Sequence, residues 1–123
     1  MASEGRLAGR VALITGGGGE IGGAIARLFG REGAEIAIAD LEPDKAQSVA
    51  RSIVDAGGRA RGFDADVADE ASAKDAVART IEAFGKLTTL VNVAATATPD
   101  GTVETLSLEQ WNKAIAVNLT GAF

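Results

Sequence analysis

Glycines cluster at one point of the sequence, in an arrangement that suits the binding of phosphate. Residues 15–22 read Thr-Gly-Gly-Gly-Gly-Glu-Ile-Gly and directly follow an apolar run at residues 11–15. Because glycine has no Cβ, this backbone can turn sharply and approach a pyrophosphate, whose charge then faces the free amides of the next helix. Gly17, Gly19 and Gly22 satisfy the Gly-x-Gly-x-x-Gly spacing. A tight structural turn is the alternative interpretation.

An acidic residue follows where a dinucleotide site needs one. Asp40 ends the next apolar run, 18 residues after Gly22, close to the ~20-residue spacing at which a carboxylate receives the ribose hydroxyls of NAD. The same charge would repel the 2′-phosphate of NADP. Neither the glycine loop nor the residues immediately after Asp40 contain Arg or Lys. NAD is therefore expected rather than NADP, unless Asp40 merely leads into a turn at Pro43.

Short apolar runs and amphipathic segments alternate along the chain. The expected strands lie at residues 11–15, 36–39, 60–64 and 90–93. Pro43 suits the first turn of a second helix, Asp69 can cap a third, and Ser107 with Gln110 has capping-box spacing for a fourth. The first helix is predicted to bury a stripe at helical spacing, formed by Ile21, Ala24, Ile25, Leu28 and Phe29.

This alternation predicts an α/β fold. Parallel strands joined by right-handed crossovers form an open, doubly wound sheet of the Rossmann type, here with about four strands and helices on both faces. Residues 1–123 are expected to form a single NAD(P)-binding domain that is incomplete at its C-terminal end. A missing fifth strand would leave the fourth strand as a bare sheet edge.

The composition restricts the classes of ligand and partner that the chain is expected to bind. The chain is 46% hydrophobic and 24% charged, as in ordinary globular proteins. It has no Cys and no His, which excludes disulfides and a thiol nucleophile and makes a metal site unexpected. A net charge of −5 without a basic run argues against nucleic acid. No apolar run approaches the length of a membrane span, so a cytoplasmic location is expected.

Taken in order, these segments resemble the short-chain dehydrogenase/reductase family. Its cofactor loop is Thr-Gly, three variable residues and Gly-x-Gly. Asp66-Val67 resembles the family's adenine-contacting pair, and residues 92–95, Asn-Val-Ala-Ala, are similar to its Asn-Asn-Ala-Gly segment. Together with the loop and Asp40, the resemblance implies these cofactor-binding residues: Gly16, Gly18, Gly19, Glu20, Ile21, Gly22, Asp40, Leu41, Asp66, Val67, Asn92 and Ala94.

The family resemblance also assigns a role to Asn118. Residues 117–121, Val-Asn-Leu-Thr-Gly, resemble the family's helical segment that carries the Asn of the catalytic tetrad, so Asn118 is the implied catalytic residue. Independently, Asn118 lies three residues after Ile115 on an apolar stripe, where a polar side chain needs a specific hydrogen-bond partner. A helix-bending Asn, or one satisfied in the core, is the alternative.

Two features depart from the family. Glu20 stands where the middle glycine is usual, which places a negative charge beside the expected pyrophosphate and should weaken binding at most. The chain contains no Tyr, whereas the family uses a Tyr-x-x-x-Lys pair as its acid-base group; that pair would follow Phe123. The chain alone is therefore expected to be catalytically incomplete.

The resulting expectation is an NAD-dependent oxidoreductase that transfers hydride between nicotinamide and a secondary alcohol or ketone of the 3-oxoacyl or small-alcohol class. Its partner would be a small-molecule substrate, and the full-length form would be a homo-dimer or homo-tetramer. One alternative is a non-catalytic dinucleotide-binding or regulatory module. Another is a methyltransferase using S-adenosylmethionine, although the segments around Asn92 and Asn118 argue against it.

Overall fold

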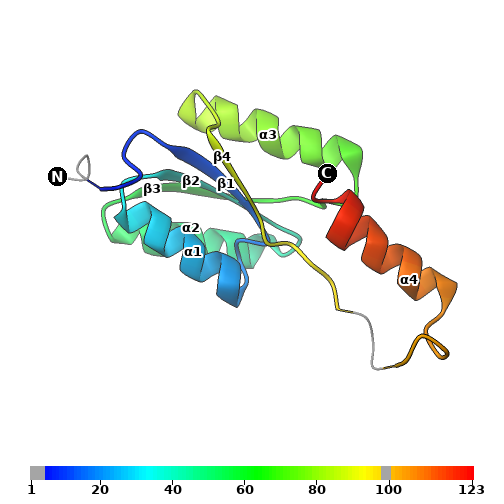
Figure 1. Cartoon of the computed structure of the whole chain (residues 1–123). Helices are drawn as coiled ribbons and strands as arrows, with labels where there is room; N and C mark the ends of the chain where they lie inside the picture. The colour runs from blue at the N-terminus through cyan, green and yellow to red at the C-terminus, as the bar shows by residue number, and fades with distance from the viewer. Residues whose placement is uncertain (1–4, 98–100) are drawn as a thin grey trace.

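The computed structural model describes residues 5–97 and 101–123 and alternates strand with helix (Figure 1). Its elements, in order, are β1 (Val11–Thr15), α1 (Glu20–Arg31), β2 (Glu35–Asp40), α2 (Pro43–Asp55), β3 (Arg59–Asp64), α3 (Glu70–Phe84), β4 (Thr89–Asn92), α4 (Leu108–Ile115) and a π-helical segment (Ala116–Thr120). The four strands form one parallel sheet in the order β3-β2-β1-β4. This confirms the predicted α/β class and strand number.

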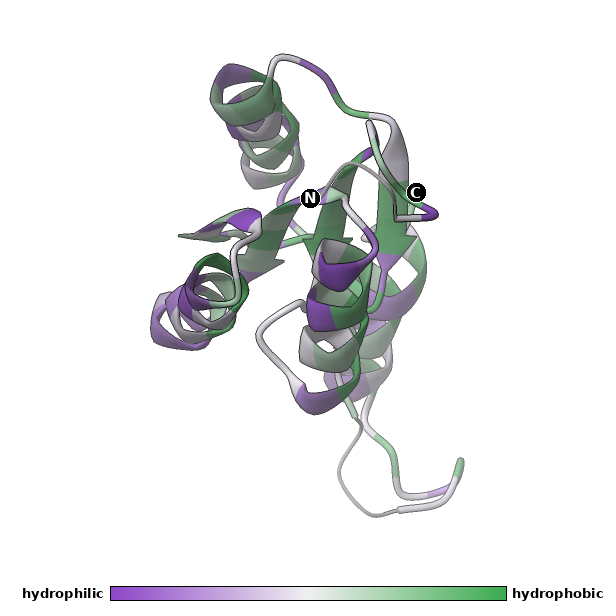
Figure 2. Cartoon of the chain, turned by 90° about the vertical axis from the view of Figure 1, so that its left-hand side faces the viewer, coloured by the Kyte–Doolittle hydropathy of each residue, from purple (hydrophilic) through white to green (hydrophobic). Residues whose placement is uncertain are grey.

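The sheet is covered on both faces. Helices α1 and α2 lie on one face and α3 on the other, while α4 lies near the carboxyl ends of the strands (Figure 1). All five residues of β1 are buried, and Figure 2 shows hydrophobic residues along the central strands and hydrophilic ones gathered on the helices. Burial on both faces explains why β1 and β2 are continuous apolar runs rather than alternating ones.

The helix ends follow the predicted capping signals. Asp69 caps α3, since its Oδ2 accepts a hydrogen bond of 3.1 Å from the Ser72 amide. At the start of α4, Ser107 and Gln110 form both hydrogen bonds of a capping box, 2.9 and 3.1 Å long. Both predicted helix starts are confirmed, because each capping signal depends on residues only three positions apart.

The predicted buried stripe of α1 is wrong in part. Ile25 and Phe29 are half-buried, but Ile21, Ala24 and Leu28 are exposed. The side of α1 that is fully buried is formed instead by small residues, Gly22, Gly23 and Ala26. The reason is close approach: the glycines let the start of α1 pack directly on the preceding loop, and this turns the larger side chains outward.

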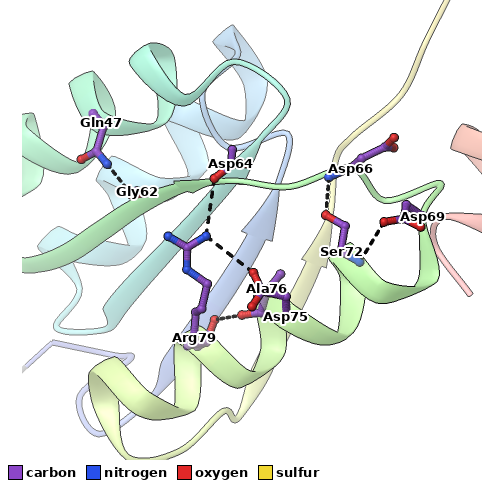
Figure 3. A network of polar contacts seen from close by, with 10 residues as sticks. Gln47, Gly62, Asp64, Asp66, Asp69, Ser72, Asp75, Ala76 and Arg79 are labelled. Carbon is purple, nitrogen blue, oxygen red and sulfur yellow. Dashed lines mark hydrogen bonds and ion pairs between the residues drawn. The ribbon is translucent and has the colours of Figure 1, made fainter.

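The two outer strands of the sheet, β3 and β4, differ in how their free edges are covered. Among the described residues β4 pairs only with β1, and its Leu90 is 53% exposed, so the predicted bare edge is present. At the β3 edge, Gln47 Nε2 donates a hydrogen bond of 2.6 Å to the Gly62 carbonyl oxygen (Figure 3). The Arg79 guanidinium lies 4.5 Å from the centre of the Phe63 ring. The Gln47 side chain thus occupies a carbonyl oxygen to which a further strand would donate a hydrogen bond.

A cavity of about 710 Å³ lies beside this edge, between α2, β3 and α3. Arg51, Arg61 and Arg79 line it together with Glu82. None of the expected cofactor-binding residues borders it. Across the described part of the chain, no helix combines the length and apolar character needed to cross a membrane.

Candidate functional site

A second cleft, of about 550 Å³, lies where the carboxyl ends of the strands meet the start of α1. Its lining includes the β1–α1 loop, the residues just after β2 and β3, and one side of α4. All of the expected cofactor-binding residues line this cleft except Gly18 and Asn92. Although it is the smaller of the two cavities, it is the one at the edge where open α/β sheets bind ligands.

The glycine loop is shaped by backbone contacts that leave no room for side chains. Gly16 has a φ of +66°, in the left-handed region that favours glycine. A Cβ there would lie 2.7 Å from the Ala94 amide nitrogen. A Cβ on Gly22 would lie 2.2 Å from the Gly16 carbonyl oxygen. The loop is therefore pressed between the end of β4 and the first turn of α1.

Some amides of this loop have hydrogen-bond partners within the chain, and others are free. Those of Gly17 and Gly19 donate to the carbonyl oxygens of Ala39 and Gly16, at 3.3 and 3.2 Å. Those of the first helical turn, on Glu20, Ile21 and Gly22, have no hydrogen-bond partner among the described residues, and Gly19 supplies no side-chain cap. Three free amides at a helix N-terminus, all on residues lining the cleft, fit a pyrophosphate group.

Asp40 is held rigidly at the end of β2. Its Oδ2 accepts a hydrogen bond of 3.0 Å from the Gly18 amide, and its Oδ1 accepts one of 2.9 Å from the Glu42 amide. Each carboxylate oxygen retains acceptor capacity for a ligand hydroxyl. Gly18, although outside the lining, thus positions Asp40. Sequence spacing placed Gly18 in the site but did not reveal this role.

The carboxylate of Asp66 is also anchored. Its Oδ1 accepts a hydrogen bond of 2.9 Å from the Ala68 amide, and the Asp66 amide donates one of 2.8 Å to Ser72 Oγ at the start of α3 (Figure 3). The second carboxylate oxygen has no partner among the described residues. Asp66 and the neighbouring Val67 therefore present one acceptor and one apolar side chain at the same end of the cleft.

Four acidic residues and one basic residue line the cleft. The acids are Glu20, Asp40, Glu42 and Asp66, and the base is Lys113 of α4. Glu42, Lys113 and Val117 were not foreseen as site residues. A weak signal existed for two of them, because Lys113 and Val117 are four residues apart and so share one face of a helix. With a single basic side chain in the lining, a phosphate in this cleft would be bound mainly by backbone amides.

Thr15, at the end of β1, binds the segment that follows β4 beneath the site. Its Oγ1 accepts hydrogen bonds from the amides of Val93 and Ala94, at 3.3 and 3.4 Å. These bonds fix Ala94 against Gly16. Asn92 pairs in register with Thr15 inside the sheet and does not reach the cleft lining.

Asn118 lies in the π-helical segment that continues α4. Its Oδ1 accepts a hydrogen bond of 2.8 Å from the Thr96 amide, and its Nδ2 donates one of 3.0 Å to the Thr96 carbonyl oxygen. Asn118 does have a specific partner, in the backbone of the segment after β4, but its side chain is exposed and not buried on an apolar stripe as the sequence argument assumed. With both ends of its amide engaged, Asn118 ties that segment to the end of α4.

We expect Asn118→Asp to destabilise the chain, because a carboxylate cannot donate to the Thr96 carbonyl oxygen and repels it. Losing one such bond should lower the free energy of unfolding by about 1 kcal/mol, measurable by urea denaturation. Asn112→Asp is the matched control, since it adds the same charge on an exposed position of α4. Equal effects of the two variants would show that the Thr96 bonds contribute nothing.

Comparisons with known proteins agree with this geometry. Residues 10–123 match the family model described as short chain dehydrogenase. The 2,5-dichloro-2,5-cyclohexadiene-1,4-diol dehydrogenase LinX of Sphingobium indicum is 49% identical over 118 residues, which cover 96% of this chain and 47% of that protein. D-threitol dehydrogenase of Mycolicibacterium smegmatis is 42% identical, with 96% and 45% covered.

Solved structures give the same picture. A short-chain dehydrogenase/reductase from Serratia marcescens superimposes with a TM-score of 0.89 at 36% identity, covering 95% of this chain and 48% of that one. The chain therefore spans about half the length of the relatives it matches.

Proposed function

Because this chain belongs to the short-chain dehydrogenase/reductase family, we propose that it is the NAD-binding part of an oxidoreductase acting on a secondary alcohol or ketone. One observation carries the proposal. Three free amides at the start of α1 and the anchored Asp40 carboxylate border the same cleft. Amides suit the pyrophosphate, and a carboxylate suits the ribose hydroxyls of NAD while disfavouring the 2′-phosphate of NADP.

Each part of the dinucleotide has a matching group in the cleft. The amides of Glu20, Ile21 and Gly22 would hold the pyrophosphate, Asp40 the adenosine ribose, and Asp66 with Val67 the adenine. When bound, the nicotinamide supplies the hydride acceptor or donor. The catalytic role that the family resemblance implies for Asn118 remains a prediction, and in this chain its side-chain amide also holds Thr96 in place.

The proposed substrate class comes from the relatives. The family's Tyr and Lys pair has no counterpart among these 123 residues, which contain no Tyr. We therefore assign proton transfer to the substrate oxygen to no residue of this chain. The relatives named above are dehydrogenases of a diol and of threitol, which supports the alcohol class over the 3-oxoacyl class.

Calorimetric titration of this chain with NAD, NADP and S-adenosylmethionine tests the proposal. We expect binding of NAD, affinity for NADP lower by about tenfold or more because of Asp40, and no binding of S-adenosylmethionine. Tightest binding of S-adenosylmethionine would favour a methyltransferase. If the chain binds neither NAD nor NADP, the proposed function is refuted.

The charge of Glu20 should lower the affinity for NAD. Glu20 is exposed and borders the expected pyrophosphate, and two unit charges about 4 Å apart repel by roughly 1 kcal/mol in water. Glu20→Gln should therefore tighten NAD binding by about fivefold at low salt, and less at high salt. Glu109→Gln, in the first turn of α4, is the control for loss of an acid near a helix start. Unchanged or weaker NAD binding by Glu20→Gln would contradict this prediction.

A further inference from the structure

A lysine lies close to the carboxylate of Asp40 without pairing with it. A Cβ built on Gly18 would lie 2.8 Å from Lys45 Cβ and 2.9 Å from Asp40 Oδ2, so the stem of Lys45 begins beside this carboxylate. The ammonium, however, points elsewhere: Lys45 Nζ lies 2.8 Å from Glu42 Oε2. The hydrogen bond to Glu42, together with its charge, raises the pKa of Lys45, and the charge of Asp40 adds a smaller contribution. Lys45 is thus a cation held at the border of the cleft.

The groups around Asp40 form a small anion-binding position. The amides of Gly18 and Glu42 converge on its two carboxylate oxygens. Converging backbone amides bind a phosphate as readily as a carboxylate. Without the Asp40 side chain, two amide donors and a nearby lysine would surround the place where a 2′-phosphate must lie. Among these neighbours, Glu42 is the group that engages the lysine ammonium.

We propose that Glu42 is a second determinant of NAD over NADP preference, because its ion pair withholds Lys45 from a phosphate on the adenosine ribose. The inference rests on the proposed function, since it places that ribose at Asp40. It corrects the sequence argument, in which no Lys or Arg was close enough to offset Asp40. Pro43 starts α2 immediately, so the first helical turn brings residue 45 back toward the end of β2.

The effect of replacing both acids distinguishes this proposal from one in which Asp40 alone sets the cofactor preference. Replacing Asp40 removes one negative charge but leaves Lys45 neutralised by Glu42. Replacing both acids frees the ammonium to pair with the 2′-phosphate. The gain in NADP affinity on removing Glu42 must therefore depend on the presence of Lys45.

The experiment compares four variants by calorimetric titration with NADP and with NAD. They are Asp40→Ser, Asp40→Ser/Glu42→Gln, the same double variant with Lys45→Met, and Asp40→Ser/Glu70→Gln. The last is the matched control, because Glu70 pairs with Lys74 on α3 in a second exposed ion pair outside the cleft, and its loss changes the net charge equally.

We expect Glu42→Gln to raise NADP affinity about tenfold over Asp40→Ser, the strength of one charge-assisted contact. Lys45→Met should abolish that gain, and Glu70→Gln should stay within about twofold of Asp40→Ser. A gain equal to the Glu70→Gln control, or one that survives Lys45→Met, would overturn the proposal. If the Asp40→Ser background does not fold, Glu42→Gln and Glu70→Gln alone give the same comparison. Failure of the unmodified chain to bind NAD would instead refute the proposed function.

Discussion

Gly22→Ala will lose most of its affinity for NAD and will be less stable than the unmodified chain. The added Cβ would lie 2.2 Å from the Gly16 carbonyl oxygen and 2.8 Å from Gly17 Cα. Both are backbone atoms, so no side-chain rotation relieves the clash, and α1 must move away from the loop. Overpacking of this kind costs about 1–3 kcal/mol of stability. Displacing one or two of the amides that hold the pyrophosphate should weaken binding by about 10- to 100-fold.

Gly19→Ala provides the control for this experiment. Its Cβ would meet only the Gly16 carbonyl oxygen, at an ordinary contact distance of 3.5 Å, and its φ of −79° suits any residue. We therefore expect its thermal unfolding to match that of the unmodified chain within a few degrees. The two variants are compared by calorimetry for NAD binding and by circular dichroism for unfolding. Full NAD affinity in Gly22→Ala would contradict the phosphate role of this loop.

Asp40→Ala should weaken the preference for NAD over NADP. It removes the acceptor for the ribose hydroxyls and leaves the amides of Gly18 and Glu42 without their present partner. NAD affinity is expected to fall by about 10- to 100-fold, the value of one or two hydrogen bonds to a charged group. NADP affinity should fall less or rise, since the repulsion of its 2′-phosphate is removed.

The ratio of the two dissociation constants is the decisive quantity for Asp40. Asp44→Ala is the control, because Asp44 is an exposed acid in the first turn of α2 and lies outside the cleft lining. We expect this control to keep the preference for NAD. If Asp40→Ala weakened both dinucleotides equally, Asp40 would serve only to order the loop and would not select the cofactor.

Local signals predicted most of the architecture. The buried strands, the Asp69 cap and the Ser107 capping box depend on neighbours along the chain, and the structure contains each of them. The glycine loop was found for the same reason, since its motif is contiguous. Where the amphipathic pattern met a close backbone approach, as at Gly22 in α1, the pattern alone predicted the wrong buried face.

The finer geometry of the site depends on contacts between distant residues. The bonds between Asn118 and Thr96 join positions 22 residues apart, and Gly18 reaches Asp40 across the same separation. Neither partner has a sequence signature, because each uses a backbone group that every residue possesses. The ion pair of Lys45 with Glu42 is short in sequence, but its relevance emerged only when the stem of Lys45 was found beside Asp40.

The most direct test of NAD binding in the glycine cleft is an NMR titration of the ¹⁵N-labelled chain with NAD. Free amides that bind the pyrophosphate should show the largest shifts, so we predict them at Glu20, Ile21 and Gly22. Gly57 and Gly85, which follow α2 and α3 outside the cleft, should not move. Shifts gathered instead around Arg51 and Arg61 in the larger cavity, with the loop amides unmoved, would contradict the account.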